Sequence, residues 1–417
     1  MPEQRKDEFV NESSRFRSKR WTNTVILAIV GGLATFRIWS SCYDDFAVYW
    51  RAGKEAIQGL SLYTEPGHYQ FKYAPFTALS MGWIHQFLLK FVGIFGITTD
   101  GFRPHGAPGG MMVSEGSRWV ANLFYWFFLW GWTAWLFGLA RRFCPISVRR
   151  ESLALVLVLL MQSLSQELNL GQVNFIPVIL MVLALRQLDL PGRPWTRALA
   201  CGAALGIAVQ FKLFSLIVFP LLAFRRRWGW IAFSLVAIAA CNLLLPGLLH
   251  GWPYALSELR AWALTLTHSS DQLLYSGHNI SWIGTIGKAT GMPALAKASW
   301  MAMVGVFLWI QFRIRNRNAD IQIAWNLAAI LILNPLVWSY WMLFLAPMLF
   351  QILARHGDWP KVRPRRIILA SLLIAPGLLA VSSPWSRDWV EPAMILGLFT
   401  VWLKGTNSCN PSESITP

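Results

Sequence analysis

Charged residues are scarce in this chain. Only 14% of its 417 residues are Asp, Glu, Lys or Arg, whereas 55% are hydrophobic. A soluble domain carries about a quarter charged residues. The apolar residues fall into repeated runs that approach the roughly 20 residues needed to cross the hydrocarbon core of a bilayer. The sequence therefore predicts a polytopic membrane protein.

Recognisable cofactor and metal motifs are also missing. The five cysteines show no CxxC or Cys/His spacing, so they predict neither a disulfide framework nor a zinc site. The chain has no Walker motif, no GxGxxG string and no D-x-D element of the nucleotide-sugar type. We therefore expect no metal and no cofactor, and ATP-driven transport loses support.

Positive charge is in excess, with a formal net charge of +17. Such an excess could indicate a nucleic-acid partner, but the Lys and Arg residues stand in short clusters between the apolar runs. This distribution follows the positive-inside rule for membrane proteins. We expect membrane lipids around the chain and no nucleic acid.

The apolar runs predict an all-α integral membrane domain with about 11 to 13 transmembrane segments. No cleavable signal peptide is expected. We expect a cytoplasmic tail at 1–21, one transmembrane domain at 22–404 and a disordered tail at 405–417. The candidate segments are 22–41, 75–96, 119–140, 151–165, 173–186, 198–210, 213–224, 229–249, 298–313, 321–334, 338–354, 367–383 and 389–403.

One apolar run, 198–224, is interrupted by Lys212 and is flanked by arginine clusters. Two half-length helices that meet at Lys212 would keep both clusters on the cytoplasmic side. Irregular backbone at membrane depth is tolerated only where it lines a cavity, and a membrane-embedded ionisable residue is a functional candidate. The ordinary alternative is that Lys212 reaches to the membrane interface.

The first external loop, 42–74, opens with the stretch SCYDDFAVYWRAG. The spacing of Phe46, Tyr49 and Trp50 predicts an amphipathic helix that lies along the membrane surface. Asp44 and Asp45 stand where this helix begins, and a carboxylate at that position is also an ordinary helix cap.

Four stretches resemble glycosyltransferase family 87, a group of polytopic GT-C enzymes that includes phosphatidylinositol-mannoside mannosyltransferases. The first is a D-F-x-x-Y string with its continuation, and the others are a G-Q-x-N element, a membrane lysine followed by arginines, and a Pro/Trp segment near the C-terminus. They are supplied by Asp45, Phe46, Tyr49, Ala52, Gly59, Tyr63, Phe71, Tyr73 and Pro75, by Gly171, Gln172 and Asn174, by Lys212, and by Pro335 and Trp338.

The chain departs from the family pattern at two places. The family often has a His shortly after the Trp, where this chain has Ser339-Tyr340-Trp341, and its N-Q-S loop appears here as His278-Asn279-Ile280-Ser281. The role of the family's His has therefore passed to Tyr340 or His278, or has been lost. Residues 98–117 look like an insertion.

The resemblance implies an inverting enzyme that moves a hexose, usually mannose, from a polyprenyl-phosphate-sugar to a glycolipid or envelope-glycan hydroxyl. Inversion needs one carboxylate to deprotonate the acceptor hydroxyl, and positive charge to stabilise the leaving phosphate. Asp45 is the predicted base. The predicted substrate-binding residues are Asp44, Arg51, Lys72, Tyr73, Gln172, Asn174, Lys212, His278, Asn279, Trp338 and Tyr340.

Each of these residues also has an ordinary role. Membrane amides join helices, Trp and Tyr form aromatic belts, and loop Arg and Lys are solvated. Counting segments back from Lys404 places Lys212 and Gln172 on the non-cytoplasmic side of the cell membrane, and Asp45 joins them only if one segment in 75–140 is re-entrant or miscounted.

Two other classes of function fit part of the pattern. A secondary transporter or lipid flippase would also use broken helices and an internal lysine, although such proteins usually show an internal repeat. A non-catalytic envelope assembly protein would tolerate Asp45→Asn, whereas an enzyme that uses this carboxylate as its base would not.

Overall fold

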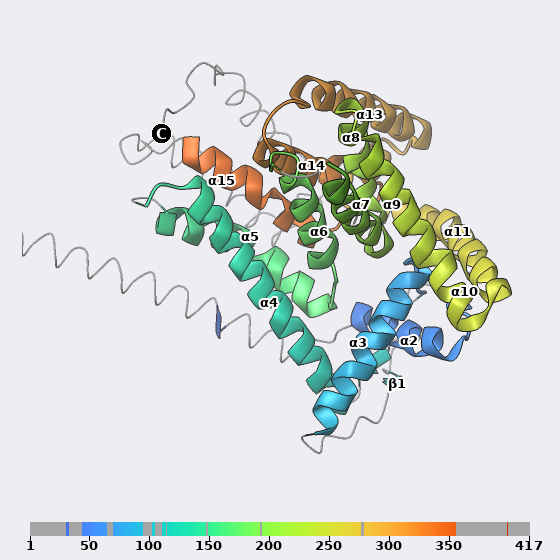
Figure 1. Ribbon diagram of the computed structural model, residues 1–417. Coiled ribbons are helices and arrows are strands. Elements are labelled where there is room, and N and C mark those ends of the chain that lie inside the picture. Colours follow the sequence, from blue (N-terminus) through green and yellow to red (C-terminus); the bar gives the residue numbers. More distant parts are fainter. Residues whose placement is uncertain are drawn as a thin grey trace, which may run out of the picture.

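The computed structural model describes residues 31–32, 44–64, 70–94, 102–104, 111–113, 115–146, 149–191, 194–276, 279–355 and 398. These residues form an all-α membrane protein with one small β-hairpin, β1 (Phe102–Pro104) and β2 (Met111–Val113). The helices, shown in Figure 1, are α2 (Asp44–Gln58), α3 (Pro75–Gly93), α4 (Glu115–Phe143), α5 (Arg149–Leu170), α6 (Phe175–Arg186), α7 (Pro194–Phe211), η1 (Leu213–Val218), α8 (Phe219–Phe224), α9 (Trp228–Ala239), η2 (Ala240–Leu244), α10 (Leu245–His250), α11 (Trp252–Leu274), α12 (Trp282–Thr290), α13 (Pro293–Ile314), α14 (Ala319–Leu333), η3 (Ser339–Leu345) and α15 (Ala346–Arg355).

Three stretches of described helix are long and apolar enough to cross a membrane, or four if a pair bent by 48° within α5 counts as one span. They are Ala121–Phe143, Trp228–His250 and Pro293–Ile314. Several further apolar helices in the described residues are shorter, so the predicted 11 to 13 segments stay a prediction. The tails 1–21 and 405–417 and the runs 22–41, 367–383 and 389–403 lie outside the described residues, apart from residues 31, 32 and 398.

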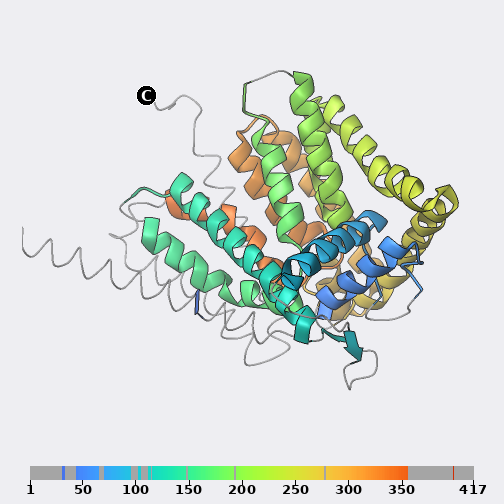
Figure 2. The same cartoon turned by 60° about the horizontal axis from the view of Figure 1, so that its bottom comes forward.

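The helices gather around a buried centre. Twelve of the fifteen residues of α14 are buried, and α14 packs against α6, α13, α15, η1 and η3. In Figure 1, α4 and α5 lie on one side of the bundle and α9 to α11 on the other, with α2 and α3 below and between them. Figure 2 shows the same arrangement with α2 and α3 turned towards the viewer.

The predicted interruption at Lys212 is confirmed. Helix α7 ends at Phe211, Lys212 has an extended backbone (φ −153°, ψ 122°), and the 3₁₀ helix η1 begins at Leu213. The broken run thus consists of two shorter helical pieces, as expected for backbone that lines a cavity.

The predicted amphipathic helix after Asp44 is present as α2, and its position along the membrane surface stays a prediction. Phe46 and Tyr49 are 0% exposed and Trp50 is 1% exposed. The face that carries these rings packs into the protein because small residues let α2 and α3 approach closely. A Cβ built on Gly53 would lie 2.6 Å from the backbone nitrogen of Gly82.

Helix α11 holds the chain that follows α2. Three of its side chains, spaced four residues apart and therefore on one face, bind backbone atoms in the segments 60–64 and 70–74. The bonds run from Tyr254 Oη to Leu60 O (3.1 Å), from Leu62 N to Glu258 Oε2 (2.9 Å) and from Trp262 Nε1 to Lys72 O (3.2 Å).

Candidate active site

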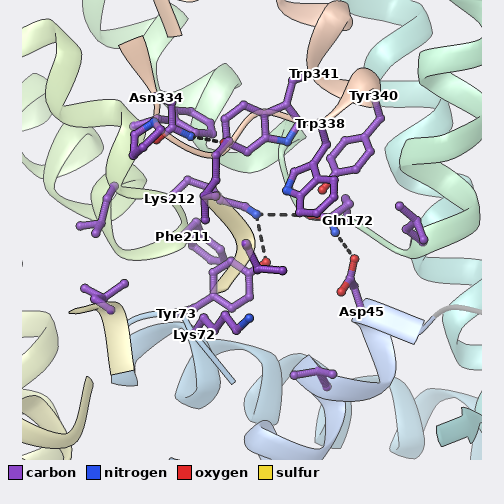
Figure 3. A pocket seen from close by; sticks show the side chains of 18 of the residues that line it. Asp45, Lys72, Tyr73, Gln172, Phe211, Lys212, Asn334, Trp338, Tyr340 and Trp341 are labelled. Carbon is purple, nitrogen blue, oxygen red and sulfur yellow. Dashed lines mark hydrogen bonds between the residues drawn. The ribbon is translucent and has the colours of Figure 1, made fainter. Parts of the chain in front are cut away.

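A cavity of about 880 Å³ lies where the break at Lys212 meets α2 and the segment 70–74. Its wall comes from α2, the segment 70–74, the end of α5, the residues around Lys212, α11 and the segment 334–341 (Figure 3). Seven of the predicted site residues line it, namely Asp45, Lys72, Tyr73, Gln172, Lys212, Trp338 and Tyr340.

The side chain of Gln172 connects the predicted base to the predicted phosphate-binding lysine. Its Nε2 donates a hydrogen bond to Asp45 Oδ2, and its Oε1 accepts one from Lys212 Nζ at 3.3 Å (Figure 3). Because a carboxylate only accepts and an ammonium only donates, the orientation of the carboxamide between them is fixed. Gln172 is 2% exposed, so this bridge forms away from bulk water.

A glycine turn places Gln172 beside Asp45. Gly171 has φ +70°, a conformation that side-chain-bearing residues rarely adopt. A Cβ at this position would lie 2.7 Å from Phe46 Cβ, so the close approach also requires glycine. Tyr125 holds the turn by donating its hydroxyl hydrogen bond to Gly171 O. The Gly-Gln pair of the G-Q-x-N element thus has a structural explanation.

Lys212 lies in the wall of the cavity. Its Nζ donates a hydrogen bond to Tyr73 Oη at 3.0 Å and lies 4.5 Å from the centre of the Tyr73 ring. The ring of Trp341 flanks the ammonium at 5.8 Å. These rings favour a cation at this position.

Lys72 adds a second cation to the same wall. Burial lowers the pKa of its ammonium from the ordinary value of 10.5, and the negative charge of Asp45 opposes this shift. The cavity therefore combines two lysines with one carboxylate. Among the residues that the structure describes, no group of three or more His, Cys, Asp or Glu could hold a metal ion.

Three predicted substrate-binding residues do not line the cavity. Asn174 is fully buried and donates from Nδ2 to Glu167 Oε2 at 2.8 Å. Arg51 is 3.8 Å from Glu55 Oε1, one turn along α2. The third is Asn279. The side chain of Asp44 and the whole of His278 lie outside the described residues.

Asn279 uses all four hydrogen-bonding positions of its side chain within the protein. It is 0% exposed, and it fixes the segment 335–337 immediately before Trp338 enters the cavity. Its Nδ2 donates to Leu274 O (2.7 Å) and Pro335 O (2.9 Å), and its Oδ1 accepts from Ser281 N (3.0 Å) and Val337 N (2.9 Å).

Sequence reasoning missed several polar residues of this site. Glu167 is 1% exposed, accepts a hydrogen bond from Asn174 Nδ2 and, through its carbonyl oxygen, another from Gln172 N, so it supports the turn that carries Gln172. The predicted membrane segment ended at residue 165, although the polar string SQELNLGQVN was a visible signal. The other unpredicted polar and indole side chains of the wall are Gln70, Gln166, Asn169, Gln210, Trp262, Ser276, Asn334 and Trp341.

The family profile of glycosyltransferase family 87 matches residues 117–347, more than half of the chain. The chain belongs to glycosyltransferase family 87. Family 87 membership makes this protein a glycosyltransferase, with a sugar donor and an acceptor as substrates, rather than a transporter, flippase or assembly protein. The family 87 match includes Gln172, Lys212 and Trp338 and begins after Asp45. No curated protein and no solved structure matches the chain.

Proposed function

We propose that this family 87 enzyme transfers a hexose, most simply mannose, from a polyprenyl-phosphate-sugar to a hydroxyl of a glycolipid or envelope glycan. The transfer takes place with inversion on the non-cytoplasmic side of the cell membrane. The observation that supports this proposal is the bridge through Gln172, which joins a carboxylate and an ammonium in the wall of one cavity. The catalytic domain would span 22–404 in a bundle of the GT-C type.

Asp45 is the proposed general base. As the acceptor oxygen attacks the anomeric carbon, its proton passes to the Asp45 carboxylate. Gln172 holds Oδ2 of that carboxylate and so orients it towards the acceptor. Holding the base in one orientation avoids the cost of ordering it during the reaction.

Lys212 and Lys72 are the proposed partners of the donor phosphate. When the bond between the anomeric carbon and the phosphate oxygen breaks, the electron pair remains on the phosphate. Two ammonium groups in a partly buried wall stabilise this charge more strongly than exposed groups would. The partial burial that strengthens this stabilisation also lowers the pKa of Lys72, and the negative charge of a bound phosphate would offset that shift.

The aromatic side of the cavity suits transfer rather than hydrolysis. Trp338, Tyr340 and Trp341 line the wall next to Lys212. Large aromatic surfaces keep water away from the anomeric carbon, so the acceptor hydroxyl has less competition.

A transfer assay tests the proposal. The purified protein is reconstituted in liposomes with radiolabelled polyprenyl-phosphate-mannose and an extract of envelope lipids. Asp45→Asn keeps the shape of the side chain but removes the base, and we expect transfer to fall by about 10²- to 10⁴-fold. The matched control is Glu55→Gln, which neutralises a carboxylate of the same helix outside the cavity.

Equal transfer by the wild type and Asp45→Asn would show that another group is the base. If the wild type transfers no sugar from any polyprenyl donor, the proposed donor is wrong.

A further inference from the structure

A buried carboxyl group supports the turn that carries Gln172. It belongs to Glu167, which stands near the end of α5 and is 1% exposed. The carbonyl oxygen of Glu167 accepts a hydrogen bond from Gln172 N at 3.0 Å, and its Oε2 accepts one from Asn174 Nδ2 at 2.8 Å. Asn174 is the residue that precedes α6, so the Glu167 side chain joins the end of α5 to the start of α6 across the turn.

Two buried oxygens of this pair lack a hydrogen-bond donor. Among the residues that the structure describes, neither Glu167 Oε1 nor Asn174 Oδ1 has a hydrogen-bond partner. Water does not reach them, because Glu167 is 1% and Asn174 0% exposed. Buried polar atoms are nearly always paired, so two acceptors without a donor on one hydrogen-bonded pair need an explanation.

The Glu167 carboxyl also has no counter-ion at contact distance. Within the described part of the chain, it forms no ion pair at 4.0 Å or less. The charged groups of the cavity bind other partners. Lys212 Nζ donates to Tyr73 Oη and Gln172 Oε1, and Asp45 Oδ2 accepts from Gln172 Nε2. A carboxylate that is buried without a paired cation is much more costly than a neutral carboxylic acid.

A single proton on the carboxyl group would satisfy both oxygens. A protonated carboxyl has one O–H donor and one acceptor oxygen, and a carboxamide likewise has a donor and an acceptor. The two groups can therefore form a closed pair of hydrogen bonds. The N–H bond of such a pair is present, from Asn174 Nδ2 to Glu167 Oε2. The atoms left over, Glu167 Oε1 and Asn174 Oδ1, are those that the O–H bond would join.

We propose that Glu167 is a neutral carboxylic acid that donates its proton from Oε1 to Asn174 Oδ1, and that this pair positions Gln172. Glu167 does not line the cavity, so it acts through Gln172 and not on a substrate. This role rests on the proposed function, in which Gln172 orients the base Asp45. The neutral acid also leaves the charge of Lys212 to the donor phosphate, whereas a second carboxylate would compete for it.

Infrared difference spectroscopy measures the proton directly. The full-length protein is purified in an ester-free detergent at neutral pH, and the spectrum of Glu167→Gln is subtracted from that of the wild type. We expect the C=O stretching band of a protonated carboxyl, which shifts in deuterated water. In Asn174→Leu this band should move, because the proton has lost its acceptor. The matched control is Glu151→Gln, which removes an exposed carboxyl of the same helix and should remove no such band.

Transfer kinetics test the positioning role. Glu167→Gln keeps the shape of the neutral acid, and its amide can make both hydrogen bonds to Asn174, so kcat should stay within about threefold of the wild type. Glu167→Met keeps the length of the side chain but leaves Asn174 unpaired. Its kcat should fall at least about tenfold, with a smaller change in donor KM, because Gln172 no longer holds the base in one orientation. Thermal unfolding of each variant separates loss of positioning from loss of fold.

A wild type without the protonated band would overturn the assignment, since an ionised Glu167 with a buried water at Oε1 gives no such band. Glu167→Gln that fails to fold, or that loses as much transfer as Glu167→Met, would contradict it too, because the charge would then be required. If Glu167→Met transfers like the wild type, the pair does not position Gln172. The infrared measurement needs no turnover, so a protein that shows the band but transfers no sugar contradicts the proposed function alone.

Discussion

The carboxamide of Gln172 offers the sharpest test of the site, because it contacts both charged groups at once. Gln172→Met keeps the length of the side chain and removes both hydrogen bonds. A hydrogen bond to a charged group contributes about 1.5–3 kcal/mol. At 1.36 kcal/mol per tenfold change in rate, the loss of the bond that orients Asp45 should lower kcat about 10- to 150-fold.

Gln172→Glu should be more harmful than Gln172→Met. The new carboxylate would lie at hydrogen-bonding distance from Asp45, and two carboxylates so close hold a proton between them. The base would then be partly protonated, and Lys212 would pair with the new charge instead of the donor phosphate. We therefore expect a further fall in kcat and a higher KM for the donor.

The measurement is steady-state transfer in liposomes, with kcat and donor KM determined separately. Gln162→Glu makes the same exchange at an exposed position of α5 and should behave like the wild type. The reasoning is refuted if folded Gln172→Glu transfers as fast as Gln172→Met, or if both lie within twofold of the wild type.

Three further substitutions follow from the described contacts. Asn279→Ala loses four buried hydrogen bonds and should lower the free energy of unfolding by roughly 2–4 kcal/mol; denaturation in detergent that matches the wild type would contradict this. In Gly171→Ala, the alanine has to adopt φ +70° with its Cβ against Phe46, so the free energy of unfolding in the same assay should fall by roughly 1–3 kcal/mol. An unchanged free energy of unfolding would show that the protein does not require this turn. Burial lowers the pKa of Lys72, so its ammonium loses its proton at a pH below the ordinary 10.5. The donor KM should therefore rise as the pH increases through that lowered pKa, and Lys72→Arg should move this rise to higher pH. If Lys72→Arg leaves the pH profile of KM unchanged, Lys72 does not bind the donor phosphate.

The parts of the fold that local sequence determines were predictable. Apolar runs and their polar interruptions lie within one stretch of chain, so the helices and the break at Lys212 could be read directly. Gln172 and Lys212 gave the same kind of signal, since polar residues stand out in apolar surroundings. Both lie in the wall of the cavity that the structure contains.

Contacts between distant segments were not predictable in this way. The periodicity of α2 shows that one face is apolar but not what covers it, and the rings of α4 beside Phe46 are about 80 residues away along the chain. Asn279 was predicted to bind substrate because it stands in the stretch that corresponds to the family's N-Q-S loop. The hydrogen bond that Asn279 accepts from Val337 N, 58 residues further along the chain, shows that its side chain binds the backbone and not a substrate.

The hydrogen bonds from α11 to the segments 60–64 and 70–74 have a consequence for the evolution of this enzyme. Tyr254, Glu258 and Trp262 bind main-chain atoms of the segments 60–64 and 70–74. Main-chain atoms survive every substitution except proline at a donor position. The path of these segments thus does not depend on their exposed side chains, such as Leu60, so substitutions there can accumulate while Lys72 and Tyr73 keep their places in the cavity wall.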